Sequence, residues 1–299
     1  MSPIPPIPHR SLAATAAIVI ATIAAGCAEP TPSVGGLLVA SGGPLQVTDG
    51  SGGLVTFDGP PSPVIAVAAS GGHVIAATAE GLLVTSSGSG GTRTWHDLDF
   101  ATGPGTGFPL MALSPLGEEL AMAVGEPQGA RFELVIAKMD VGSSRSIAVE
   151  RGLNGPPTWI GPGTIAIDVI KPDGDSAIAT IDVASGAVTD DAFAGRLVSA
   201  ALDGGRLALD DPATGEVLVG EAGIGGFDRT AQVAHLVGPP GSGVDGLALS
   251  PDGSRLAVVR RTDVGLVSIE LYRVLERNWT SVLTLSLGSD APVSLAWLK

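Results

Sequence analysis

The residue with the clearest chemical signal is Cys27, the only cysteine in the chain. It follows residues 11–25, an uncharged stretch of apolar and small side chains that is preceded by His9 and Arg10. A positive start, an apolar stretch of about 7–15 residues and small residues at the cut are typical of a secretory signal peptide. The stretch is shorter than the roughly 20 residues that cross a bilayer as a helix. We therefore expect an export signal over residues 1–26, rather than a permanent membrane-spanning anchor.

The segment Ile23-Ala-Ala-Gly-Cys27 resembles the lipobox of bacterial lipoproteins, with Ala24 where leucine is most common. The resemblance implies lipid attachment to the Cys27 sulfur and cleavage between Gly26 and Cys27. The alternative is a chance or buried cysteine after an ordinary signal. Two or three acyl chains hold a protein firmly at a membrane, because each buried CH₂ contributes about 0.8 kcal/mol. We expect a lipid-anchored protein on the extracytoplasmic face of the cell membrane, with residues 28–35 as a Pro/Ser linker.

Two clusters of charged residues are candidate binding sites. Asp173 and Asp175 flank a glycine; calcium needs six to eight oxygen ligands, and turn-forming aspartates are the alternative. Arg260, Arg261 and Asp263 are expected in a loop that follows a strand. There they could bind an acidic partner or form a solvated turn.

No residues have the spacing of a catalytic or metal site. His73, His96 and His235 are expected in different repeats of the chain, and the pair Asp210-Asp211 is a further acidic cluster that we place in a loop. Zinc needs three or four converging ligands, and no G-x-S-x-G nucleophile motif occurs. We therefore expect no catalytic residue, no resident metal and no cofactor.

The composition predicts an acidic protein with a β fold. The chain has 299 residues with 43 glycines and 23 prolines, and 44% of the residues are hydrophobic. Abundant glycine with many valines, leucines and isoleucines indicates short strands and tight turns rather than helices. The net charge is −14, and an acidic surface repels nucleic acid and anionic lipid headgroups. We expect a monomer with no nucleic-acid partner.

An internal repeat indicates the architecture. Residues 247–259 and 111–123 both read apolar strand, Ser-Pro-x-Gly turn, two polar residues, apolar strand. The proline presets φ for the turn and the glycine can adopt the positive φ that follows. Weaker copies occur at 64–79, 157–169, 197–209 and 293–299. A second pair of strands follows the copies, and four short strands per 40–50 residues are the signature of a propeller blade.

The two ends of the repeat region complete each other. Residues 36–57 supply three short strands without a preceding inner strand, and residues 293–298 supply an inner strand with nothing after it. We therefore predict an all-β domain over 36–299: a propeller of six four-stranded blades, closed by its N- and C-terminal strands. Closure hides the strand edges of an open sheet. The alternatives are seven blades or a pair of β-sandwiches.

The pattern Leu249-Ser-Pro-Asp-Gly253 with Leu256-Ala257 resembles the repeats of TolB-type and LpqB-type propellers, a WD-repeat-like class. Leu113–Gly117 matches with Leu116 in place of the aspartate. The resemblance covers about 265 residues by period. It implies a propeller, and LpqB-type proteins are actinobacterial lipoproteins that assist an envelope sensor kinase. Those proteins are larger, with an N-terminal domain for which this sequence has no counterpart.

These features favour a non-enzymatic binding or scaffold lipoprotein whose partner is an envelope protein or a cell-wall glycan. One alternative is a propeller enzyme of the lactonase, glycosidase or quinone-dependent dehydrogenase class, which needs carboxylates or histidines converging on a channel mouth. Another is an envelope protein that binds a metal ion.

Overall fold

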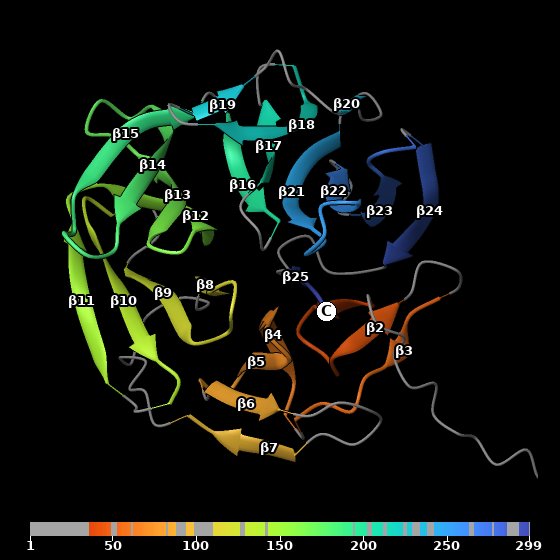
Figure 1. The fold of residues 1–299 in the computed structure, drawn as a ribbon. Coiled ribbons are helices and arrows are strands. Elements are labelled where there is room, and N and C mark those ends of the chain that lie inside the picture. The colour runs from red at the N-terminus through yellow and green to blue at the C-terminus, as the bar shows by residue number, and fades with distance from the viewer. Residues whose placement is uncertain are drawn as a thin grey trace, which may run out of the picture. The chain divides into compact units, whose positions relative to one another are not determined.

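The structure, a computed structural model, describes residues 36–298 with gaps. The gaps are 49–52, 61, 82, 88–93, 99–109, 126–128, 141–142, 194, 202–204, 212–213, 224–225, 229–233, 238–241, 263–265, 277 and 286–292. The predicted signal peptide, Gly26, Cys27, the linker and Asp263 lie outside the described residues. Within the described part all regular structure is β, and six sheets form a ring (Figure 1). The predicted six-bladed propeller is confirmed.

We number the blades by their place in the chain. Blade 1 contains β25 (Ser294–Trp297), β1 (Leu37–Ala40), β2 (Gln46–Thr48) and β3 (Val55–Thr56). Blade 2 contains β4 (Val64–Ser70), β5 (His73–Thr78), β6 (Leu83–Ser87) and β7 (Thr94–Asp97). Blade 3 contains β8 (Leu110–Leu113), β9 (Glu119–Gly125), β10 (Phe132–Lys138) and β11 (Ser144–Val149).

The second half of the ring repeats this pattern. Blade 4 contains β12 (Gly152–Gly161), β13 (Thr164–Ile170), β14 (Ser176–Asp182) and β15 (Val188–Phe193). Blade 5 contains β16 (Arg196–Ala200), β17 (Arg206–Asp211), β18 (Glu216–Gly223), β19 (Gly226–Asp228) and β20 (Ala234–Val237). Blade 6 contains β21 (Ser242–Leu249), β22 (Arg255–Thr262), β23 (Val267–Arg273) and β24 (Asn278–Leu285). Blade 5 differs from the four-stranded prediction because β19 and β20 both pair with β18.

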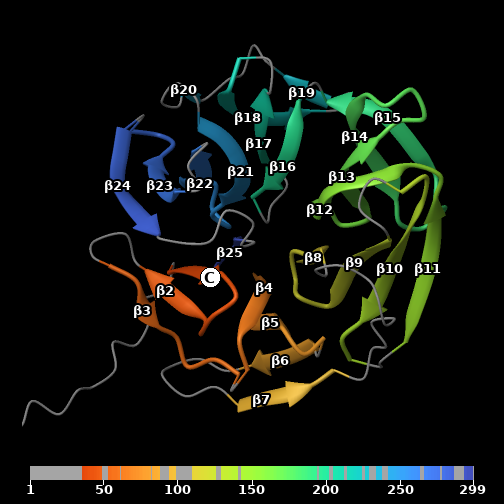
Figure 2. The same cartoon turned by 180° about the vertical axis from the view of Figure 1, so that it is seen from behind.

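The ring closes as predicted. In blade 1 the last strand, β25, pairs with the first, β1, in the register Leu37↔Trp297 to Ala40↔Ser294. The backbone N–H of Leu298 also donates to the carbonyl of Gly36 at 2.8 Å. The innermost strands β25, β4, β8, β12, β16 and β21 surround the centre in both views (Figures 1 and 2). Each blade therefore has one edge at the centre of the ring and one at its rim.

The hydrophobic core lies between the blades. Alternate side chains of each inner strand point to opposite faces of its sheet, so each blade packs on both neighbours. Six buried clusters result, one between each pair of adjacent blades. Blades 3 and 4, for example, share Phe132, Leu134, Trp159 and Ile165. The runs of valine, leucine and isoleucine in the sequence are explained by this two-sided burial.

The Ser-Pro-x-Gly turns act as the sequence predicts. In blade 6 the Ser250 hydroxyl accepts a hydrogen bond from the Arg255 backbone N–H at 2.9 Å, and the Gly253 N–H donates to the Ser250 carbonyl. In blade 3 the Ser114 hydroxyl accepts from the Glu119 N–H at 3.0 Å. The serine closes each turn onto the next strand, which fixes where that strand begins.

A hydrogen bond between a side chain and the backbone connects each blade to the next near the centre. Between blades 3 and 4 the Trp159 indole N–H donates to the Ala112 carbonyl at 3.2 Å. Between blades 6 and 1 the Trp297 indole N–H donates to the Ala248 carbonyl at 2.8 Å. The hydroxyls of Ser294, Ser70, Thr158 and Ser199 make the bonds at the other four junctions. The inner strands therefore hold one another in register around the ring.

The two faces of the ring differ in the connections that they carry. We call the turn face the one with the turns between the first and second strands and between the third and fourth strands of each blade. Its described segments are 53–54, 71–72, 114–118, 139–140, 143, 162–163, 183–187, 201, 205, 250–254 and 274–276. The loop face carries the remaining connections. Its described segments are 41–45, 57–60, 62–63, 79–81, 98, 129–131, 150–151, 171–175, 195, 214–215 and 266.

Candidate functional site on the loop face

A cavity of about 150 Å³ lies at the centre of the ring. Inner strands of all six blades line it, toward their turn-face ends, with side chains that include Ala68, Met111, Leu249 and Trp297. The polar side chains among its described lining residues are the hydroxyls of Thr158 and Ser199. None of these lining residues carries an ionisable group, so the described lining does not supply the converging carboxylates or histidines that the enzyme alternative requires.

A buried group of charged side chains lies instead between blades 5 and 6. The Arg260 side chain, in β22, is 2% exposed, and its Nε donates to Glu270 Oε2 in β23 at 2.8 Å. Arg196 lies at the start of β16, where it pairs with Asp210 at 3.6 Å and donates to the Val244 carbonyl at 3.1 Å. The hydrogen bond from Arg196 to Val244 crosses from blade 5 to blade 6, whereas Arg260 and Glu270 both belong to blade 6.

Four buried polar atoms of this group lack a hydrogen-bond partner in the structure. They are Nε of Arg196, Nη1 and Nη2 of Arg260 and Oδ1 of Asp210. Burial raises the pKa of Asp210 to about 6, although the charges of Arg196 and Arg260 oppose that rise. Three donors and one acceptor in a buried setting can bind a small polar group that both accepts and donates hydrogen bonds.

The structure places Arg260 and Arg261 differently from the sequence prediction. Both belong to β22, which continues to Thr262, and are not in a loop. Arg260 faces the interior, whereas Arg261 forms an ion pair with Asp245 of β21. The prediction failed because successive strand residues point to opposite sides, and one of these two arginines is neutralised inside the fold.

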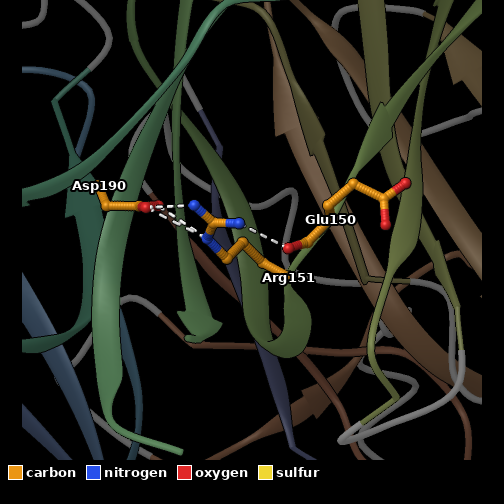
Figure 3. A network of polar contacts seen from close by, with 3 residues as sticks. All are labelled: Glu150, Arg151 and Asp190. Carbon is orange, nitrogen blue, oxygen red and sulfur yellow. Dashed lines mark hydrogen bonds and ion pairs between the residues drawn. The ribbon is translucent and has the colours of Figure 1, made fainter. Parts of the chain in front are cut away.

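A second ion pair on the loop face lies in blade 4. The Arg151 guanidinium donates from Nε and Nη2 to the Asp190 carboxylate, with a shortest distance of 2.6 Å, and from Nη1 to the Glu150 carbonyl (Figure 3). The hydrogen bond with Asp190 raises the pKa of Arg151. About a quarter of each paired side chain is exposed. The pair joins the entry of the innermost strand of blade 4 to the outermost strand, β15.

Asp173 and Asp175 occupy the turn between β13 and β14, also on the loop face. Both are exposed, and Asp173 Oδ1 accepts the Asp175 backbone N–H at 3.1 Å. The two aspartates form part of a hydrogen-bonded turn, as the turn-forming alternative predicts. They lie in blade 4, with blade 5 between them and Arg261, so the structure does not bring the predicted binding residues into one cluster.

No group of three or more histidine, cysteine, aspartate or glutamate side chains in the described part of the chain is placed to hold a metal ion. His73 and His96, expected in different repeats, belong to one sheet, that of blade 2. Asp210 and Asp211, expected in a loop, end strand β17. Among the described residues no helix is long and apolar enough to cross a membrane.

Several residues of the loop-face sites have no signal in the sequence. Arg196, Asp245 and Glu270 are single charged residues in otherwise ordinary strands. Glu270 is ten positions from Arg260, a spacing that indicates a contact only once the two strands are known to pair. The resulting loop face carries two partly exposed ion pairs, an acidic turn and a buried charged group.

Known proteins resemble this chain in structure. No family model and no curated protein matches it. Putative TolB from Agrobacterium tumefaciens has a TM-score of 0.57 and 16% identity, with 89% of this chain and 98% of that chain covered. TolB from Acinetobacter baumannii has a TM-score of 0.62 and 15% identity, covering 88% and 66%. A protein from Lactobacillus plantarum has a TM-score of 0.54 and 14% identity, covering 89% and 100%. At such identities the likeness shows the fold, which is a β-propeller like that of TolB.

Proposed function

We propose that the chain is an exported lipoprotein, anchored through Cys27, whose propeller is a non-enzymatic binding module of the cell envelope. The loop face is its binding surface, and the partner is another envelope protein or a cell-wall glycan. The lipobox-like segment that ends at Cys27 supports the anchor. The likeness to two TolB structures supports a binding propeller.

The observation that carries the proposal is the placement of charge. The described lining of the central cavity has no ionisable side chain, whereas the loop face presents Arg151 with Asp190 and Arg261 with Asp245. Partly exposed ion pairs on a rigid frame can exchange their partner for a group on another molecule. A binding surface suits this distribution better than an active site does.

The anchor is tested by the mass of the protein from its native host. We expect intact-mass spectrometry to find a chain that begins at Cys27 and carries acyl groups, and Cys27→Ala to abolish both changes. The variant should remain folded, because the described propeller does not include residue 27. An unmodified Cys27 in the wild-type chain would refute the anchor.

The binding surface is tested by matched charge reversals. We expect Arg151→Glu and Arg261→Glu to lower, several-fold, the amount of partner protein that co-purifies from cross-linked envelopes, or of chain that sediments with purified cell wall. The control is Arg273→Glu on the turn face, where Arg273 pairs with Glu276 at 3.0 Å. Equal losses in all three variants, or no stoichiometric partner and no binding to cell wall, would contradict the proposal.

A further inference from the structure

The chain enters the propeller on the turn face. Gly36 lies directly before β1, and its carbonyl accepts a hydrogen bond from the N–H of Leu298, directly after β25. In the other blades the equivalent connection, between the first and second strands, is a turn of the turn face. The N-terminal segment therefore joins the ring beside the turn-face mouth of the ring, in blade 1.

The length of that segment limits where a lipid at Cys27 can lie. Residues 28–35 separate Cys27 from Gly36, and fully extended they reach at most about 30 Å. A seven-residue strand such as β4 spans about 23 Å from one face of the ring to the other. Because the tether starts on the turn face and exceeds the thickness of the ring by only a few ångströms, its shortest path to a bilayer is the one with the turn face toward the membrane.

Four of the five exposed large apolar side chains in the described part of the chain lie at the turn face. Leu116, in the turn of blade 3, is 71% exposed, and Leu275, in a turn of blade 6, is 64% exposed. Val55 and Val188 begin strands that start at the turn face, and both are at least 36% exposed. Leu266 is the fifth and lies on the loop face. Because blades 3 and 6 lie on opposite sides of the ring, Leu116 and Leu275 can contact a flat surface such as a bilayer at two separate points.

We propose that the turn face lies on the phospholipid surface to which Cys27 is anchored, and that the loop face points away from the membrane toward its partner. This inference rests on the proposed lipid anchor. Two partly inserted leucines bury far less apolar surface than two or three acyl chains do, so they add little to retention at the membrane. Their contribution is to fix the orientation of the ring.

The experiment uses the acylated full-length chain in vesicles of phosphatidylcholine and phosphatidylglycerol. Three single variants, Leu116→Cys, Leu275→Cys and the matched control Leu266→Cys, each receive a fluorescent probe. The acylated Cys27 sulfur does not react, so the introduced thiol is the one labelled. We expect a quencher attached to the lipid headgroup to reduce fluorescence at positions 116 and 275 several-fold more than at 266.

The outcomes separate the two proposals. Equal quenching at all three positions, or stronger quenching at 266, overturns the orientation while the anchor stands. An unmodified Cys27 appears independently, as a second labelled thiol and as a chain without acyl mass, and refutes the anchor on which the orientation rests. Each variant is compared with the parent by circular dichroism, because a change confined to an exposed leucine leaves the sheets intact.

Discussion

Asp210 shows how a propeller interface makes one residue sensitive to pH. The carboxyl lies between blades 5 and 6, where removal from water raises its pKa to about 6, against about 3.9 in an unfolded chain. The folded protein therefore binds this proton more tightly than the unfolded chain does. Asp210 contributes stability that is fully present below about pH 4 and is lost as the pH rises through 6.

We predict that Asp210→Asn removes this part of the pH dependence. Relative to the variant, the wild-type protein should lose roughly 3 kcal/mol of unfolding free energy between about pH 4 and pH 7, from a shift of about two pKa units. Urea unfolding at a series of pH values measures the difference. Asp211→Asn, at the next position of β17, is the control. A wild-type curve parallel to that of Asp210→Asn would contradict the assignment.

The charged residues also mark the limit of sequence interpretation at this scale. From the sequence alone, lone acids and adjacent arginines are expected in solvated loops. For Arg261 the expected exposure is partly correct, because its side chain is partly exposed. For Arg260 the expected exposure is wrong, because Glu270 on the neighbouring strand supplies a counter-charge inside the fold. A buried pair of this kind depends on which strands adjoin, and no local pattern encodes that.

At the scale of elements, the Ser-Pro-x-Gly turns were predictable because serine, proline and glycine each impose a backbone requirement at a fixed position. Their contacts with the neighbouring blade were not. Gly71, the first residue of the Gly-Gly turn of blade 2, has φ +57°, and a Cβ there would lie 2.2 Å from the Leu116 carbonyl oxygen. The Ser70 hydroxyl donates to the Pro115 carbonyl at 2.9 Å in the same place. Gly71 is therefore needed for two reasons. Its own turn requires a positive φ, and the turn of blade 3 leaves no room for a side chain.

Gly71→Ala and Gly72→Ala test this contact as a matched pair. Both glycines have positive φ, but a Cβ at Gly72 meets nothing within 4 Å. We expect Gly72→Ala to cost about 1–2 kcal/mol, the strain of a left-handed alanine. Gly71→Ala should cost roughly 1–3 kcal/mol more, because the backbone of blade 3 must move. Urea unfolding at neutral pH measures both, and equal losses would show that the contact between blades carries no energy.

At the scale of the whole molecule, the number of blades and the closure could be predicted, since half a repeat at each end of a periodic sequence leaves few other arrangements. The prediction required no side-chain contact. It could not show that Trp159 and Trp297 bond to the same motif. Trp159 and Trp297 both donate to the alanine of an Ala-Leu-Ser-Pro segment in the preceding blade, Ala112 or Ala248. At these two junctions the Ser-Pro-x-Gly segment of one blade therefore contacts the tryptophan of the next blade.

Closure makes the last strand a structural requirement for the entire ring. β25 pairs with β1, Ser294 bonds to Val67 of blade 2, and Trp297 bonds to Ala248 of blade 6, so one strand connects three blades. We predict that deletion of 294–299 lowers the unfolding free energy by more than the about 3–5 kcal/mol expected for losing a buried tryptophan, since the edge of β1 is also exposed.

Adding back the strand separates loss of closure from general damage. A synthetic peptide of residues 290–299 should restore cooperative urea unfolding to the truncated chain, because register along β1 is specified by the buried side chains of both strands. The same peptide with Trp297→Ala and Ser294→Ala retains the backbone pairing but lacks both side-chain bonds, and should restore less. A truncated chain with the midpoint and slope of the intact protein would mean that the ring is held by its six inter-blade cores without its closing strand.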